Sequence, residues 1–301
     1  MIEEKVIERI RRLPGLNRAA SIRKIEKGFS FDEKYVVDGT RLVRIFSSEE
    51  SARREQEFQT LRALSRYSER IPVVYDFGRM PGEDRHYMVL GFQAGEDGEA
   101  ALPYMTEHAQ YRAGYEAAVE LSRLHRFQAP PETPSWYEAK KKKNDRYIKG
   151  LLELDVDPGM KAALITYVQE NEYLMKDRPT RFQHDDFLPS NLIFRDGQFA
   201  GLIDFQRMDW GDPAHDLQKL GFFAVNTSIP FSRGALDGYR ENAFEGDGFW
   251  ELYSYYSAVH VISSLVWGKT MGEENYRRIY QYVLRVMDDH EQFTRLVPKW
   301  Y

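Results

Sequence analysis

A β-hairpin pattern in an otherwise helical second half of the chain constrains the fold most. Two short apolar runs, Leu192–Phe194 and Phe199–Ile203, flank an Asp-Gly pair, and this dipeptide between apolar runs is typical of a tight hairpin turn. Asn191 directly precedes the first run, and Asp204 follows the second. Because a hairpin returns the chain to the edge from which it started, we expect Asn191 and Asp204 to lie close together.

Strand-like runs dominate the first third of the chain. They are Ser21–Ile25, Tyr35–Val37, Leu42–Phe46, Val73–Phe77 and Tyr87–Phe92. Between the third and fourth runs, Ser47 followed three residues later by Glu50 is typical of a capping box. It predicts a helix with Phe58, Leu61 and Leu64 on one face. Residues 1–92 therefore read as an antiparallel sheet with one inserted helix.

Helical patterns dominate after Gly95. We expect helices over residues 107–127 and 137–152, and a third that opens at Asp157 with a proline in its first turn. In the second of these helices, Lys140–Lys143 reads as a solvated face. Residues 214–296 are mostly helical in pattern. The predicted fold is therefore α+β, with units over residues 1–94 and 95–301.

Composition excludes several classes of protein. The chain has 301 residues, 42% hydrophobic and 30% charged, which excludes a disordered chain or a coiled coil. It has no cysteine, so disulfides and thiolate zinc sites are excluded. A net charge of −5 argues against nucleic-acid binding, and no apolar run approaches the roughly 18 residues of a membrane span. We expect a cytoplasmic protein without a signal peptide and see no sign of an obligate protein partner.

Three polar side chains carry the predicted chemistry. A carboxylate and an amide oxygen that converge at the hairpin edge, from Asp204 and Asn191, are ligands that Mg²⁺ accepts. Asp186 lies five residues before Asn191. Its carboxylate could orient a hydroxyl and accept the proton as that hydroxyl attacks a phosphoryl group.

The spacing of these residues resembles that of the aminoglycoside phosphotransferase family. The matching residues are His184-x-Asp186-x-x-x-x-Asn191, Ile203-Asp204-Phe205 and Gly211-Asp212-Pro213-x-x-Asp216-Leu217. The resemblance implies a protein-kinase-like fold, with an N-terminal antiparallel sheet lobe and a larger helical C-terminal lobe. It also implies phosphorylation of a hydroxyl on a small-molecule acceptor, with ATP or GTP and Mg²⁺ as cofactors.

The resemblance implies roles for the residues of the second lobe. Asp186 would be the catalytic base, Asn191 and Asp204 the metal ligands, and His184 a brace for the catalytic loop. Asp212 and Asp216 would brace the loop and a helix. The family commonly has glycine where this chain has Asp185, which offers a rival base and adds negative charge.

The resemblance also implies a nucleotide site in the first lobe. Strand alternation places Leu42 and Arg44 on one face, where the family has an adenine contact and a phosphate-binding lysine. Glu55 would pair with Arg44, with Glu57 as the alternative. The other expected nucleotide contacts are Gly28 and Ser30 in a covering loop, and Leu90 and Phe92 in a hinge.

The acceptor stays open at this point. An acidic stretch, Asp237–Glu251, would suit a polycationic aminoglycoside, while a macrolide, choline, an amino alcohol or a sugar derivative is the alternative. Arg44 and Asp185 also leave room for a nucleotide-binding homologue without catalysis. A metal-dependent phosphohydrolase with His184, Asp185, His125 and Asp204 as ligands is a further alternative, disfavoured because the first of these lies in a loop.

Overall fold

The chain forms two compact units, which are considered one at a time. The computed structural model describes residues 2–26, 31–244 and 246–301. The first unit consists of residues 1–96, 193–195 and 200–206. The second consists of residues 97–192, 196–199 and 207–301.

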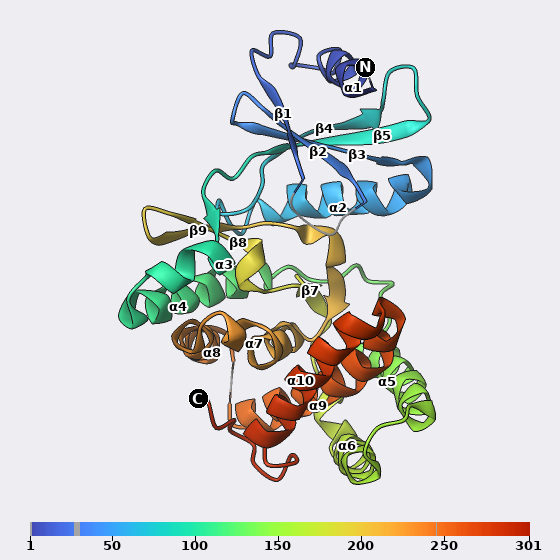
Figure 1. Cartoon of the computed structure of the whole chain (residues 1–301), viewed down its shortest axis with the longest axis vertical. Helices are drawn as coiled ribbons and strands as arrows, with labels where there is room; N and C mark the ends of the chain where they lie inside the picture. The colour runs from blue at the N-terminus through green and yellow to red at the C-terminus, as the bar shows by residue number, and fades with distance from the viewer. Residues whose placement is uncertain (1, 27–30, 245) are drawn as a thin grey trace. The chain divides into compact units, whose positions relative to one another are not determined.

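A five-stranded antiparallel sheet forms the centre of the first unit (Figure 1), in the order β1–β2–β3–β5–β4. The strands are β1 (Ile22–Ile25), β2 (Glu33–Val37), β3 (Arg41–Ser47), β4 (Val74–Arg79) and β5 (Arg85–Gly91). All five predicted strands are present, with ends displaced by one or two residues. The prediction of an antiparallel sheet in this part of the chain is therefore confirmed.

Two helices cover the two faces of this sheet. From α1 (Ile2–Ile10), Val6 and Ile10 pack with Tyr35 and Val43 in one apolar cluster. On the other face, Phe58 of α2 (Ser51–Leu64) lies with its ring centre 5.7 Å from that of Phe77. The sheet is therefore buried on both sides, and its central strands hold side chains in fixed positions.

The predicted capping box at Ser47 is wrong. The Ser47 side chain caps no helix, because the chain first makes a short 3₁₀ turn over Ser48–Glu50 and α2 begins only at Ser51. The hydroxyl of Ser51 donates to the Ser48 carbonyl at 2.7 Å. Local hydrogen bonds of serine side chains thus replace the reciprocal cap.

Helices dominate the second unit (Figure 1). They are α3 (Gly98–Ala101), α4 (Glu107–Leu124), α5 (Trp136–Glu153), α6 (Pro158–Glu170), α7 (Gln218–Phe222), α8 (Ile229–Ala243), α9 (Phe249–Gly268) and α10 (Glu273–Asp289). The apolar core forms around α9, with side chains from α5, α6 and α10 packed against it. As predicted, Asp157 caps α6, accepting from the Met160 backbone N–H at 2.7 Å. No helix in the described part of the chain is long and apolar enough to cross a membrane.

Glycines let α4 and α8 approach each other closely. A Cβ on Gly114 of α4 would lie 2.0 Å from the Phe231 carbonyl oxygen, and one on Gly234 of α8 would lie 1.9 Å from that of Tyr111. Both distances are far inside van der Waals contact, so no larger residue fits without movement of a backbone. The two helices therefore pack backbone against backbone.

The hairpin predicted after Asn191 is present. Its strands are β8 (Leu192–Arg195) and β9 (Gln198–Leu202), joined by the expected Asp-Gly turn, and with β6 (Glu96–Asp97) they form a small sheet in the order β6–β8–β9. A second pair, β7 (Arg181–Gln183) and β10 (Asp209–Gly211), is antiparallel. The segment with Asp185 and Asp186 directly follows β7, so that strand fixes where the segment begins.

Candidate active site

Asp186 and Asn191 are brought together in the second unit. The Asn191 side-chain amide donates to the Asp186 carboxylate at 3.0 Å and to the Asp186 backbone carbonyl at 2.9 Å. With its nitrogen used in this way, Asn191 keeps its side-chain oxygen as an acceptor. The five-residue spacing thus closes a short loop in which one side chain orients the other.

Asp216 holds the backbone of this loop. This residue lies in the 3₁₀ helix η6 (Pro213–Leu217), and its carboxylate accepts from the backbone N–H groups of His184 at 2.7 Å and Asp185 at 2.8 Å. His125 lies 3.0 Å from the same carboxylate and 2.8 Å from the Tyr239 hydroxyl. His125 is thus a core histidine with polar partners, which agrees with its sequence interpretation.

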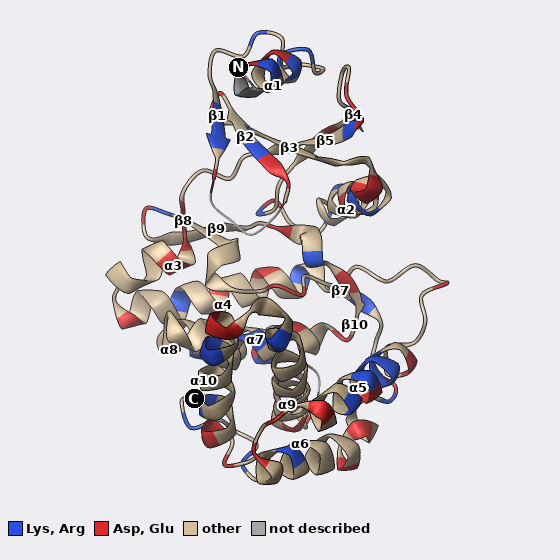
Figure 2. Ribbon diagram, turned by 45° about the vertical axis from the view of Figure 1, so that its right-hand side comes forward, with Lys and Arg blue, Asp and Glu red and all other residues tan. Residues whose placement is uncertain are grey.

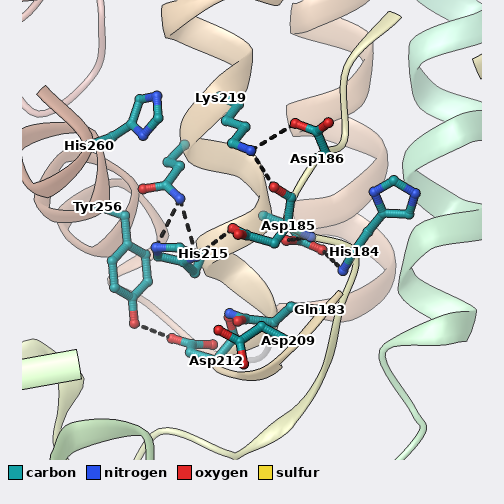
Figure 3. Close-up of polar contacts among 12 residues, drawn as sticks. Gln183, His184, Asp185, Asp186, Asp209, Asp212, His215, Lys219, Tyr256 and His260 are labelled. Carbon is teal, nitrogen blue, oxygen red and sulfur yellow. Dashed lines mark hydrogen bonds and ion pairs between the residues drawn. The ribbon is translucent and has the colours of Figure 1, made fainter. Parts of the chain in front are cut away.

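Asp212 makes a second brace. Its carboxylate accepts two hydrogen bonds from the Arg178 guanidinium, at 2.7 and 2.9 Å, and one from the Tyr256 hydroxyl at 2.7 Å (Figure 3). The side chain is fully buried. The contacts of Asp212 and Asp216 support the bracing roles expected for them.

Asp185 differs from Asp186 in backbone and surroundings. Its φ is +52°, in the left-handed region that glycine adopts most readily and aspartate tolerates. Its carboxylate lies 3.8 Å from His215 Nδ1 (Figure 3). Burial raises the pKa of Asp185 and outweighs the opposing effect of Lys219. The Asp185 carboxylate thus faces His215, and the Asp186 carboxylate faces Lys219 and Asn191.

Lys219 is a site residue that sequence reasoning missed. From α7, its ammonium donates to the Asp186 carboxylate at 2.9 Å and to the Asp185 backbone carbonyl (Figure 3). Burial alone would raise the pKa of Asp186, but the Lys219 ammonium, together with His184 and Arg207, more than offsets it and lowers that pKa. Asp186 is therefore ionised at neutral pH.

Lys140 corrects the interpretation of the lysine run on α5. Figure 2 shows basic residues along this helix, but Lys140 itself is only 6% exposed, and its ammonium lies 2.6 Å from His215 Nε2. Burial lowers the pKa of Lys140 to about 7 and that of His215 well below its usual range. Lys140 therefore belongs to the buried face of α5 and not to a solvated one.

Asp204 belongs to the first unit and has features of a ligand. Its φ is +63°, and strained backbone of this kind often marks functional positions. One carboxylate oxygen, Oδ1, is buried and accepts no hydrogen bond from the described residues. A buried carboxylate oxygen without a donor is costly unless a cation faces it. The chemistry of Asp204 thus fits a Mg²⁺ ligand.

Arg44 is held in a buried network of four charges in the first unit. Its guanidinium contacts the carboxylates of Asp32 and Glu57, each at 2.6 Å. Arg54 of α2 contacts the same two carboxylates at 3.0 and 3.2 Å. Burial alone would lower the pKa of Arg44, but Glu57 and Asp32 raise it above its usual range.

The predicted pairing of Arg44 with Glu55 is therefore wrong. Glu55 is exposed, and Glu57 is the partner from α2. The buried face of α2 follows the spacing i, i+3, i+4, i+7 from Arg54 through Glu57 and Phe58 to Leu61, and this spacing leaves out Glu55. The spacing of the apolar residues on α2 thus indicates Glu57, and not Glu55, as the partner of Arg44.

Three further residues predicted to contact the nucleotide lie at the end of the sheet: Leu42, Leu90 and Phe92. Leu42 of β3 and Leu90 of β5 are cross-strand partners, and the Phe92 backbone N–H donates to the Thr40 carbonyl at 2.9 Å. The Phe92 N–H is therefore already used within the first unit. Gly28 and Ser30 lie outside the described residues.

Comparison with known proteins identifies the family of this chain and solved structures with a similar fold. Residues 21–253 match a model of the phosphotransferase enzyme family APH, whereas no curated protein matches the chain. The ADP-bound structure of aminoglycoside phosphotransferase APH(2'')-Ib is 19% identical, with a TM-score of 0.66, over 94% of this chain and 96% of that one.

Two further solved structures have the same fold. The GDP and kanamycin complex of APH(2'')-IIIa is 17% identical, with a TM-score of 0.72, over 93% of this chain and 97% of that one. A choline/ethanolamine kinase family protein from Mesorhizobium loti is 15% identical, with a TM-score of 0.68, over 98% of each chain. The predicted protein-kinase-like α+β fold is thus confirmed.

Two matched substitutions test which glutamate of α2 pairs with Arg44. Glu57→Gln leaves two buried guanidinium groups facing one carboxylate, so it should lower the free energy of unfolding by about 3 kcal/mol. Glu55→Gln changes an exposed side chain and should alter it by less than about 0.5 kcal/mol. Urea unfolding followed by tryptophan fluorescence and circular dichroism measures both. Equal effects of the two substitutions would contradict the pairing.

The buried ammonium of Lys140 generates a pH prediction. Its pKa is about 7 when folded and 10.5 when unfolded, so between these pH values the unfolded chain holds more protons. The free energy of unfolding should therefore rise with pH in this window, by at most about 1.4 kcal/mol per pH unit. Lys140→Met should abolish this rise, and Lys142→Met, an exposed neighbour, should keep it. Urea unfolding at pH 7 and pH 9 checks this, and an unchanged slope in Lys140→Met would contradict it.

Proposed function

This chain belongs to the phosphotransferase enzyme family, and on that premise we propose that it transfers the γ-phosphoryl group of ATP or GTP to a hydroxyl of a small molecule. The geometry at Asp186 is the observation that carries the proposal. An ionised carboxylate, oriented by Asn191 and Lys219, suits a group that positions a hydroxyl and takes its proton.

The transfer needs one bond made and one broken. The acceptor oxygen bonds to the γ-phosphorus as the bond from that phosphorus to the β–γ bridging oxygen breaks. The hydroxyl proton passes to Asp186, and the nucleoside diphosphate leaves. Asn191 and Asp204 would hold Mg²⁺, which neutralises phosphate charge when bound. The role of Asp186 is chiefly to orient the acceptor, because its lowered pKa makes it a weak base.

The first unit would hold the nucleotide. Leu42 and Leu90, paired across β3 and β5, would contact the base, together with Phe92. Arg44 would face the phosphates, with Glu57 in place of Glu55 fixing its guanidinium. Gly28 and Ser30 complete the proposed nucleotide contacts. The ADP and GDP complexes of the structural neighbours support a nucleotide as the phosphoryl donor.

The acceptor is the finer part of the proposal. The kanamycin complex of a neighbour favours an aminoglycoside, which would make the protein an antibiotic-resistance enzyme. In this chain, however, Asp237 accepts hydrogen bonds from Tyr111, Tyr301 and Arg240, and Glu241 accepts one from Tyr115. These carboxylates of the acidic stretch already hold protein partners. A different small hydroxyl compound is therefore the favoured acceptor.

Asp186 and Asp185 provide the test of the catalytic assignment. Asp186→Asn keeps the shape but cannot accept a proton, so phosphoryl transfer should fall at least about 100-fold, with nucleotide affinity nearly unchanged. Asp185→Asn keeps a side chain that tolerates a positive φ and should cost much less. Nucleoside-diphosphate release across an acceptor library measures both. A larger loss in Asp185→Asn would overturn the assignment, and a catalytically silent homologue would release no diphosphate with any acceptor.

Asp204 provides the test of the metal. Asp204→Ala should abolish the gain in nucleotide affinity that Mg²⁺ gives the native protein, because it removes the principal anionic ligand. Calorimetric titration of ADP with and without Mg²⁺ checks this, with Asp209→Ala, an exposed carboxylate, as the control. If the metal effect is retained in Asp204→Ala, Asp204 is not a ligand.

A further inference from the structure

Two cations flank the Asp186 carboxylate. Lys219 Nζ donates to Oδ1 at 2.9 Å, and Arg207 Nε lies 3.9 Å from Oδ2. The Lys219 ammonium has three N–H groups, and Asp186 and the Asp185 carbonyl take two of them. The Arg207 side chain is 60% exposed and makes no hydrogen bond to the described residues. Both cations therefore keep donors for a ligand.

More positive charge lies behind Lys219. Lys140 is buried against His215, and the fields of Lys143 and Lys219 act on both. Burial lowers the pKa of His215 and of His260 well below the usual range, so both imidazoles are neutral at neutral pH. No carboxylate of the described residues forms a hydrogen bond or ion pair with the Lys140 ammonium, which is unusual for a buried lysine.

Two cationic groups lie beside the Asp186 carboxylate, Lys219 Nζ at 2.9 Å and Arg207 Nε at 3.9 Å, so one carboxylate faces two cations. Further out, Lys140 and Lys143 add positive charge around Asp185, while Asp209 and Asp216 add negative charge. A polycationic acceptor would meet both cations beside Asp186, whereas an anionic group on the acceptor would supply a second counter-charge for them.

We propose that Lys219 and Arg207 form an anion subsite beside Asp186 and that the acceptor is a hydroxy acid, a small molecule with a carboxylate a few bonds from the reacting hydroxyl. This inference rests on the proposed phosphotransfer. The acceptor hydroxyl donates a hydrogen bond to Asp186. The acceptor carboxylate is bound by the free Lys219 N–H and by the Arg207 guanidinium, whose paired N–H groups match carboxylate geometry. The contact of the acceptor carboxylate with Lys219 and Arg207 determines which hydroxyl of the acceptor lies beside Asp186 and reacts.

Matched acid and neutral ligands test the subsite. The protein, saturated with Mg²⁺ and ADP, is titrated calorimetrically with racemic glycerate and glycerol, and with gluconate and sorbitol. The acids should bind at least about tenfold more tightly than their neutral counterparts. Lys219→Met should remove this preference and Lys219→Arg should retain it. Lys142→Met, an exposed lysine of α5, should behave as wild type. Arg207→Gln changes an exposed side chain and serves as the second test if Lys219→Met does not fold.

Several outcomes would overturn the subsite. They are equal binding of an acid and its neutral counterpart, no binding of either acid, an unchanged preference in both Lys219→Met and Arg207→Gln, and tighter binding of kanamycin than of the acids. The anion that Lys219 and Arg207 bind could instead be the transferred phosphoryl group. Repeating the titrations with a non-hydrolysable ATP analogue in place of ADP distinguishes the two. If the two cations bind the transferred phosphoryl group, the bound analogue will prevent binding of glycerate and gluconate. Lys219→Met will then lower the affinity for the analogue more than the affinity for ADP.

The same titrations distinguish failure of the subsite from failure of the proposed function. A protein that does not bind ADP with Mg²⁺ would contradict phosphotransfer. The acids can then be titrated into the nucleotide-free protein, where the preference for acids and its loss in Lys219→Met still test the subsite.

Discussion

The carboxylate of Asp216 is the interaction on which the catalytic loop depends. It is fully buried and accepts from two successive backbone N–H groups, those of His184 and Asp185, while His125 approaches it from the end of α4. Without it, two buried N–H groups would lack acceptors, at a cost of about 1–3 kcal/mol each. Together with the Lys219 ammonium on the Asp185 carbonyl, these contacts hold Asp185 in its left-handed conformation. The backbone that carries Asp186 is therefore held by a residue thirty positions further along the chain, while Asn191 and Lys219 orient its carboxylate.

Sequence reasoning reached the parts of the structure that local rules determine. The strands of the first unit and the hairpin after Asn191 follow from apolar runs and turn residues, and the cap at Asp157 follows from one side chain and its neighbours. The contact between Asp186 and Asn191 also follows from spacing, because five residues of loop bring the two side chains within reach. The resemblance to a family supplied the overall fold, which no local pattern could have specified.

The errors and omissions came from tertiary packing. Glu57 replaces Glu55 at Arg44 because the apolar face of α2 turns it inward. Lys140 is buried because it lies four residues after Trp136 on α5, on a face read as solvated. Lys219 had no motif at all: its role exists only because α7 packs against the loop after β7. A charged residue is expected at the surface, and only the assembled fold shows which charges are paired inside.

The close packing of α4 and α8 bears on how the enzyme could be evolved in the laboratory. His125 directly follows α4, and Tyr239 lies on α8. The two side chains are hydrogen-bonded to each other, and the imidazole contacts Asp216. A methyl group added at Gly114 or Gly234 would force the helix axes apart and move the histidine away from the loop. A random library would thus yield many inactive clones there that look like losses of acceptor recognition. Keeping both glycines constant would leave selection to report on specificity alone.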